Sequence, residues 1–137
     1  MPATARLFYK NERGTVVVID AKGLPVSDNP CIFPIFALHV HSGGSCLGNE
    51  NDPFSSAGMH YNPRGCPHPY HAGDLPPLFC AGGYAFLAAL TDRFSVDEII
   101  GKTVVLHAQK EDFFTQPAGN AGERIACGEI VKSHRKF

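Results

Sequence analysis

The sequence lacks the features that mark several broad classes of protein. It has no tryptophan, two methionines and no apolar run near the ~20 residues that a bilayer-spanning helix needs. Its 12 basic and 13 acidic residues give a formal net charge of −1. We therefore expect neither nucleic acid nor a membrane as a partner. The first six residues contain no apolar segment typical of a signal peptide, and this favours a cytoplasmic location. The alternative is a secreted protein whose signal peptide has been removed.

The 137 residues are enough for one domain, which we expect to span residues 1–137. Hydrophobic residues make up 44%, while 14 glycines and 11 prolines indicate many turns. Runs of β-branched and aromatic residues predict strands. The predicted strands cover residues 7–9, 15–20, 33–41, 83–91, 103–108 and 125–132. One helical turn is predicted at 97–100, after the capping box of Ser95 and Glu98. An all-β sandwich or barrel follows from this pattern.

Two long loops interrupt the predicted strands, at residues 42–78 and 111–124. A compact domain rarely keeps a structureless loop as long as the first one unless the loop is functional or held in place. We therefore examine these segments for functional residues.

Histidine is unusually frequent, with seven residues in the chain. His39 and His41 are two apart on a predicted strand, so their side chains share one face. Two exposed or half-buried histidines on a polar strand face are the simpler interpretation of this pair. His107 ends another predicted strand, where a lone histidine more often has a structural role.

The first long loop contains three more histidines and an aspartate, His60, His68, His71 and Asp74. Imidazole and carboxylate groups suit zinc, which takes four ligands tetrahedrally. The alternative is a polar loop in which histidine is merely frequent. Six histidines and an aspartate are too many ligands for one tetrahedral zinc. Two neighbouring metals that share one ligand would account for all of them.

The five cysteines leave at least one free thiol unless two chains are joined. Cys66 lies in the histidine-rich loop, but the set of three histidines and Asp74 is complete without it. We assign no function to Cys31, Cys66 or Cys80.

Five blocks of this sequence, in order, resemble the copper/zinc superoxide dismutases, and the zinc stretch is most similar to that of the bacterial branch. The resemblance covers roughly residues 14–132. The blocks are Leu38-His39-Val40-His41, Ala57-Gly58-Met59-His60-Tyr61-Asn62-Pro63, His71-Ala72-Gly73-Asp74-Leu75, Ile100 through His107, and Gly119 through Gly128.

The resemblance implies an immunoglobulin-like Greek-key β-sandwich or barrel with long metal-binding and electrostatic loops. It implies two metal cofactors, copper and zinc, with His60 shared between them. The implied copper ligands are His39, His41, His60 and His107, and the implied zinc ligands are His60, His68, His71 and Asp74. It further implies a disulfide between Cys46 and Cys127, and it leaves His134 as a tail residue.

The implied activity is the dismutation of superoxide to O₂ and H₂O₂. The copper would alternate between Cu(II) and Cu(I), and the His60 bridge would break and take up a proton. Arg124 would dock the superoxide anion. The alternative is a related module that binds zinc or copper without turnover. All four copper positions and Arg124 are intact in this sequence, and this favours the enzyme.

Three departures from the family pattern lead to further expectations. The first two predicted strands resemble the family's second and third strands, so we expect the family's first strand to be missing. Its loss would expose a sheet edge; we therefore predict a homodimer or an edge covered by another segment. The family's outer-shell aspartate is replaced by Glu111 or Asp112, with the choice open. Residues 113–118 are uncharged, so electrostatic guidance of superoxide must come from Lys110, Arg124 or the other loop.

Overall fold

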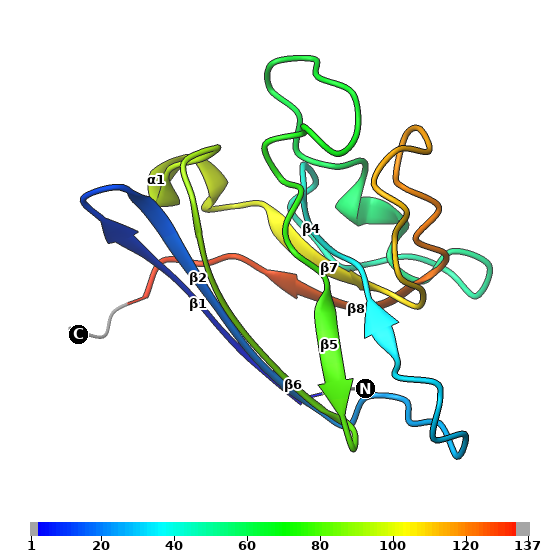
Figure 1. Ribbon diagram of the computed structural model, residues 1–137. Coiled ribbons are helices and arrows are strands. Elements are labelled where there is room, and N and C mark those ends of the chain that lie inside the picture. The colour runs from blue at the N-terminus through cyan, green and yellow to red at the C-terminus, as the bar shows by residue number, and fades with distance from the viewer. Residues whose placement is uncertain (1–2, 134–137) are drawn as a thin grey trace.

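A computed structural model describes residues 3–133, with side chains from residue 8 onward; His134 lies outside the described residues (Figure 1). Its strands form two antiparallel sheets. The five-stranded sheet has the order β1 (Ala3–Asn11), β2 (Gly14–Lys22), β6 (Tyr84–Thr91), β5 (Leu78–Ala81) and β3 (Ile35–Phe36). The three-stranded sheet has the order β4 (Leu38–His41), β7 (Thr103–His107) and β8 (Arg124–Glu129). The predicted all-β sandwich is confirmed.

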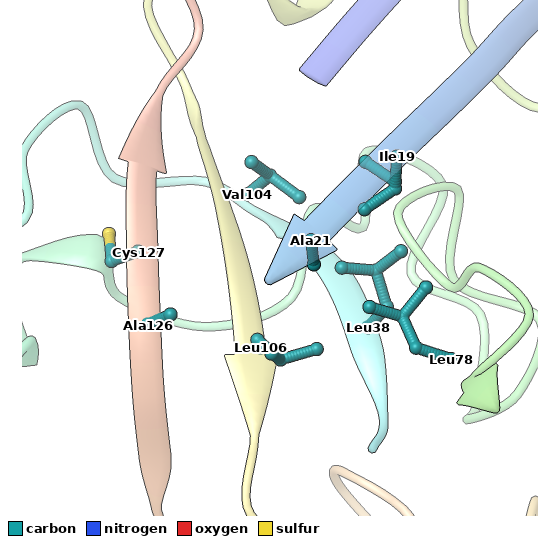
Figure 2. Close-up of a pocket in the computed structure, with 8 residues that line it drawn as sticks. All are labelled: Ile19, Ala21, Leu38, Leu78, Val104, Leu106, Ala126 and Cys127. Atoms are coloured by element: carbon teal, nitrogen blue, oxygen red, sulfur yellow. The ribbon is translucent and has the colours of Figure 1, made fainter. Parts of the chain in front are cut away.

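The apolar core lies between the two sheets. On β2, Val17, Ile19 and Ala21 are buried and alternate with partly or fully exposed residues, as expected for a sheet with one solvated face. Figure 2 shows Ile19 and Ala21 pointing from β2 toward side chains of the facing sheet and of β5. Those facing side chains are Leu38, Leu78, Val104 and Leu106.

β4 differs from β2 because all four of its residues are buried. Leu38 and Val40 belong to the core between the sheets. His39 and His41 therefore lie on the opposite face, and they too are at most 1% exposed. Figure 1 shows why: the two long loops gather beside β4 and β7 and cover that face. The predicted placement of the two histidines on one face of a strand is thus confirmed.

The predicted strand at 33–41 is wrong as a single element. The chain pairs with β5 through Ile35 and Phe36 and with β7 from Leu38 onward. Between these pairings Ala37 bonds to other partners: its N–H donates to the carbonyl of Gln109, and its carbonyl accepts from the N–H of His107. This residue is where the chain passes from one sheet to the other.

β5 begins at Leu78, the last residue of the predicted first long loop, and continues through residues 79–81, where the sequence predicts no strand. Cys80 and Ala81 pair with β6 across a two-residue turn of Gly82 and Gly83, both with positive φ. Glycine at both central positions is typical of a tight β-hairpin turn. That dipeptide is the signal by which the hairpin is recognisable from sequence.

The remaining predicted elements are confirmed with small shifts in their bounds. The hairpin of β1 and β2 turns between Asn11 and Gly14. The single α-helical turn, α1 (Val96–Ile99), begins with the full capping box of Ser95 and Glu98. Within residues 3–133, no helix combines the length and apolarity needed to cross a bilayer.

The two sheets also have unpaired edges among the described residues. β1 pairs with β2 alone, and β8 pairs with β7 alone. β1 therefore has an unpaired sheet edge, and no other strand among the described residues covers it.

Candidate metal centre

Six histidines from separate parts of the chain meet on the outer face of the three-stranded sheet. His39 and His41 come from β4 and His107 from the end of β7, while His60, His68 and His71 come from the first long loop. All six are buried, with exposed fractions of 7% or less. The imidazole rings of His39 and His60 are stacked with their centroids 3.9 Å apart. The six histidines identified from the sequence thus form one contiguous site.

The first ligand set consists of ring nitrogens that lie within 4.8 Å of one another, and its members are His39, His41, His60 and His107. Nε2 of His41 and Nε2 of His107 are 3.3 Å apart. Nδ1 of His39 and Nε2 of His60 are buried and have no hydrogen-bond partner. Because unpaired buried polar atoms are costly, these nitrogens indicate a position for a metal ion.

The other nitrogens of this set are held by the protein. Nδ1–H of His41 donates to the carbonyl of Gly58 at 2.8 Å, and Nδ1–H of His107 donates to the carbonyl of Gly122 at 3.3 Å. With Nδ1 protonated, Nε2 of each ring carries the free lone pair. The backbone therefore fixes the tautomer that a metal ligand needs.

The second ligand set surrounds Asp74. Its oxygens lie 2.9 Å from Nδ1 of His60, 3.1 Å from Nδ1 of His68 and 3.3 Å from Nδ1 of His71. Despite this closeness, Nδ1 of His68 and Oδ1 of Asp74 make no hydrogen bond. Three imidazole nitrogens and one carboxylate facing a common point fit the donor set that zinc prefers.

Distance alone also groups His39 with His60, His68 and Asp74. The contacts of His71 argue for placing His71, rather than His39, in the second ligand set. Its Nδ1 lies 3.1 Å from Nδ1 of His60 as well as beside Asp74. His39, in turn, has one unpaired nitrogen, which the first set needs to reach four ligands.

The carboxylate of Glu111 contacts one histidine of each ligand set. One carboxylate oxygen contacts Nε2 of His68, and the other lies 3.3 Å from Nε2 of His39. Asp112 faces elsewhere and accepts hydrogen bonds from the N–H groups of Phe114 and Thr115. The choice that the sequence left open is therefore settled in favour of Glu111.

Burial controls the charge of these groups. It lowers the pKa of His39 and His41 to about 2 and that of His107 to about 4. Neighbouring histidines lower the pKa of His39 further. Burial also raises the pKa of Glu111. At neutral pH the three imidazoles are uncharged, the state in which imidazole binds metals.

An open cavity leads to the first ligand set, and Arg124 is the permanently charged residue in its wall. The cavity is lined by His41, Met59, His60, Asn62, His71, His107, Pro117, Ala118, Gly122 and Arg124. The guanidinium of Arg124 donates to the carbonyls of Phe54 and Gly58, which hold it in place. Lys110 lines a different hollow with Glu111 and Asp112. Of the sources of positive charge expected from sequence, Arg124 is the one at this cavity.

A disulfide joins Cys46 and Cys127, as the family resemblance implied. It ties the first long loop to β8 across a sequence separation of 81 residues. In the chain-entropy description, closing a loop of this length stabilises the fold by about 4–5 kcal/mol. Cys31, Cys66 and Cys80 are free thiols.

The arrangement defines a class: β-sandwich proteins in which buried histidines and an aspartate form two overlapping groups that could hold metal ions. Comparison with known proteins agrees, because residues 3–130 match the family model for copper/zinc superoxide dismutase (SODC). The chain belongs to the copper/zinc superoxide dismutase family. Copper and zinc are the metals of this family.

Individual relatives support the assignment. A Cu-Zn superoxide dismutase 2 from Aquifex aeolicus is 33% identical over 92% of this chain and 77% of that protein. A Cu-Zn superoxide dismutase from Deinococcus radiodurans is 31% identical over 88% of this chain and 72% of that protein. The solved Cu/Zn superoxide dismutase of Brucella abortus has a TM-score of 0.76 and 25% identity, covering 91% of this chain and 86% of that chain. A SOD-like protein from Bacillus subtilis also has a TM-score of 0.76, with 26% identity, covering 92% and 88%.

Proposed function

We propose that the protein dismutates superoxide at a copper site that shares His60 with a zinc site. The observation that carries the proposal is the position of the His60 ring. Its Nε2 is unpaired beside the first ligand set, and its Nδ1 lies 2.9 Å from Asp74 in the second. One imidazole therefore presents a nitrogen to each site.

In this proposal the first set, His39, His41, His60 and His107, holds copper, and the second set, His60, His68, His71 and Asp74, holds zinc. Four imidazole nitrogens suit the tetragonal preference of Cu(II). Three imidazoles and one carboxylate satisfy a tetrahedral zinc without an open position, which is typical of a structural site. The unpaired nitrogens of His39, His60 and His68 fit these roles.

Copper, when bound, supplies the one-electron exchange that dismutation requires. The protein contributes the remaining functions. The carbonyls of Gly58 and Gly122 hold His41 and His107 in one tautomer. His60, with a nitrogen toward each site, is placed to hold or release a proton beside the cavity. The wall of the cavity directs the anion to this position.

Arg124 is the group we assign to anion docking. Its guanidinium is anchored by two backbone carbonyls and lines the cavity together with three of the proposed copper ligands. A permanent positive charge at the end of a cavity attracts a small anion, and superoxide dismutase is a known example of such electrostatic steering. The uncharged Pro117 and Ala118 on the same wall leave this function to Arg124.

The test is the rate of superoxide removal by protein reconstituted with one copper and one zinc per chain, beside a His107→Ala variant. We expect a fast rate that falls to background in the variant. If the wild-type protein is fully loaded with both metals and removes superoxide no faster than the metal-free protein, the dismutase proposal is wrong. The module that binds metals without turnover would then be the better description.

We also propose that the protein is a homodimer that pairs through the outer face of the five-stranded sheet. Phe79, Tyr84, Phe86 and Leu90 on β5 and β6 are between 53% and 71% exposed. Together they form an exposed apolar face of a few hundred Å², about the size of the largest apolar patch on a typical monomer, and such patches are often interaction sites. Asp20 and Lys22, two apart on β2, place opposite charges where a second copy pairing about a two-fold axis can match them.

Light scattering at high micromolar concentration tests this pairing. We expect a dimer for the wild-type protein and a monomer for Phe86→Lys. The matched control is Leu47→Lys, which changes a residue of similar exposure, 72%, on the first long loop. A monomeric wild-type protein would overturn the proposal.

A cytoplasmic location is the last part of the proposal. The three free thiols support it, because reducing compartments keep thiols free, whereas the disulfide between Cys46 and Cys127 is a bond that oxidising compartments favour. Fractionation of cells that express the natural gene tests it. Recovery of the protein outside the cytoplasm would contradict it.

A further inference from the structure

Met59 is an exposed methionine at the mouth of the proposed copper site. It is one of the two methionines in the chain. Its neighbour in sequence is the shared ligand His60, and it lines the same cavity as His41 and His107. The residue is 60% exposed. Nothing in the role of a buried four-histidine site requires a thioether at this position.

Hydrogen bonds fix the backbone at Gly58 and Met59. The carbonyl of Gly58 accepts hydrogen bonds from Nδ1–H of His41 and from the guanidinium of Arg124. The carbonyl of Met59 accepts from the N–H of Ser42 at 2.8 Å. These bonds hold the Cα of Met59 beside the cavity, while its unbranched side chain remains free to move. A flexible donor is thus attached to a rigid base.

The chemistry of the thioether selects among metals. Soft thioether sulfur favours Cu(I), while zinc is well served by imidazole and carboxylate. Among the residues that line the cavity, Met59 is the one with a sulfur atom. Cu(I) arriving from solvent therefore meets a soft ligand at the mouth before it meets the buried imidazoles.

We propose that Met59 captures Cu(I) at the mouth and passes it to the four histidines, so that copper rather than zinc fills that set. The inference rests on the proposed function in that it needs a copper site behind the cavity. A simpler role for Met59 is apolar contact with Pro117 and Ala118 on the same wall. Leucine would serve that role equally well, so Met59→Leu separates the two explanations.

The first experiment measures uptake of Cu(I) by the metal-free protein under anaerobic conditions, with a chromogenic Cu(I) chelator as donor and stopped-flow detection. We expect Met59→Leu to take up Cu(I) about tenfold more slowly, which corresponds to a loss of about 1.4 kcal/mol. Uptake of Zn²⁺ by the second set should be unchanged, and it also reports that the variant is folded. Equal Cu(I) uptake by the two proteins would overturn the proposal.

A second measurement observes the ligand directly. In protein labelled with ¹³C at the methionine methyl groups, the Met59 signal is the one that disappears in Met59→Leu. In a His107→Ala background, where the handover site lacks one ligand, Cu(I) should shift the Met59 signal and Zn²⁺ should not. A Met59 signal unmoved by Cu(I) would also overturn the proposal.

A failure of the Met59 proposal can be distinguished from a failure of the proposed function. The electron paramagnetic resonance spectrum of the Cu(II)-loaded wild-type protein reports whether nitrogen ligands bind the copper. A four-nitrogen spectrum together with unaltered Cu(I) uptake in Met59→Leu rejects the role of Met59 alone. Loss of the four-nitrogen spectrum in the wild-type protein rejects the copper site itself.

Discussion

Glu111 contacts His68 through a carboxylate oxygen and Nε2, although the two residues are 43 positions apart in sequence. The other oxygen of the same carboxylate lies 3.3 Å from Nε2 of His39. One buried acidic group therefore orients one histidine from each ligand set. The Nδ1 atoms of both rings have no hydrogen-bond partner and are free to serve as the proposed metal ligands. Outer-shell carboxylates of this kind fix the tautomer and raise the basicity of a ligand.

Glu111→Gln tests this relationship. The amide retains one oxygen acceptor, but its NH₂ group replaces the second acceptor with a donor that faces an imidazole N–H. We expect zinc affinity to fall by about 10–100-fold, the usual cost of losing an outer-shell partner. Competition with a chelator of known affinity measures this. The matched control is Asp112→Asn, which alters the adjacent carboxylate outside the site, and equal losses in both variants would contradict the assignment.

Arg124→Ala should slow superoxide removal by the fully metal-loaded protein by about tenfold, the effect of losing about 1.4 kcal/mol of anion attraction. Removing the charge should also flatten the dependence of the rate on ionic strength, because screening acts on that attraction. Arg124→Lys keeps the charge and should keep most of the salt dependence. Lys110→Ala is the control, since Lys110 lines a different hollow. A larger rate loss in Lys110→Ala than in Arg124→Ala would refute this account of steering.

The metal-free protein should lose stability as the pH falls below about 6.5, the ordinary pKa of histidine. Burial lowers the folded-state pKa of His39 and His41 to about 2 and that of His107 to about 4. Between these values and 6.5 the unfolded chain binds protons that the folded chain does not, so acid favours unfolding. Each such histidine lowers the free energy of unfolding by up to about 1.4 kcal/mol per pH unit.

Denaturant titrations of the chelator-treated protein at several pH values between neutral and mildly acidic measure this slope. The metal-free His107→Gln variant should show a smaller slope, because one titrating group is gone. A free energy of unfolding that is constant or rises on acidification would show that these histidines are not buried in their neutral form.

Part of this site could be predicted from the sequence because it depends on local geometry. The period of two along β4 places Leu38 and Val40 opposite His39 and His41, and the structure confirms this. The identity of the outer-shell carboxylate could not be predicted in the same way. Glu111 and Asp112 are adjacent acidic residues, and which one turns inward depends on the path of the second long loop. That path is set by tertiary contacts, such as the hydrogen bond from the N–H of Ala37 to the carbonyl of Gln109.

The strands show the same difference between what local sequence determines and what tertiary contacts determine. β6 is a nearly continuous apolar run that would also fit a short helix, and its length and the glycine pair before it favour a strand. β5 has four residues, too few for periodicity to identify it, although the glycine pair that follows it is a hairpin signal. The break at Ala37 has no signal in composition, because it arises where the chain changes from one sheet to the other.

Gly119 is the position at which the fold makes room for Glu111 and His68. Its φ of +70° is one that residues with side chains rarely adopt. A Cβ at this position would lie 2.5 Å from Nε2 of His68 and 2.8 Å from a carboxylate oxygen of Glu111. The buried carboxylate and imidazole would have to move, and they are the groups that orient both ligand sets. Gly119→Ala should therefore weaken zinc binding by about as much as Glu111→Gln, roughly 10–100-fold.

The first long loop offers a control with the same backbone strain and free space. Gly65 has a φ of +65°, and a Cβ there would meet nothing within 4 Å. Gly65→Ala should cost roughly 1–2 kcal/mol of stability for the left-handed conformation and leave zinc affinity unchanged. Chelator competition and denaturant titration on both variants separate the effect of backbone strain from that of steric contact with Glu111 and His68. If Gly65→Ala weakened zinc binding as much as Gly119→Ala does, backbone strain would explain the loss, and the contact with Glu111 and His68 would not.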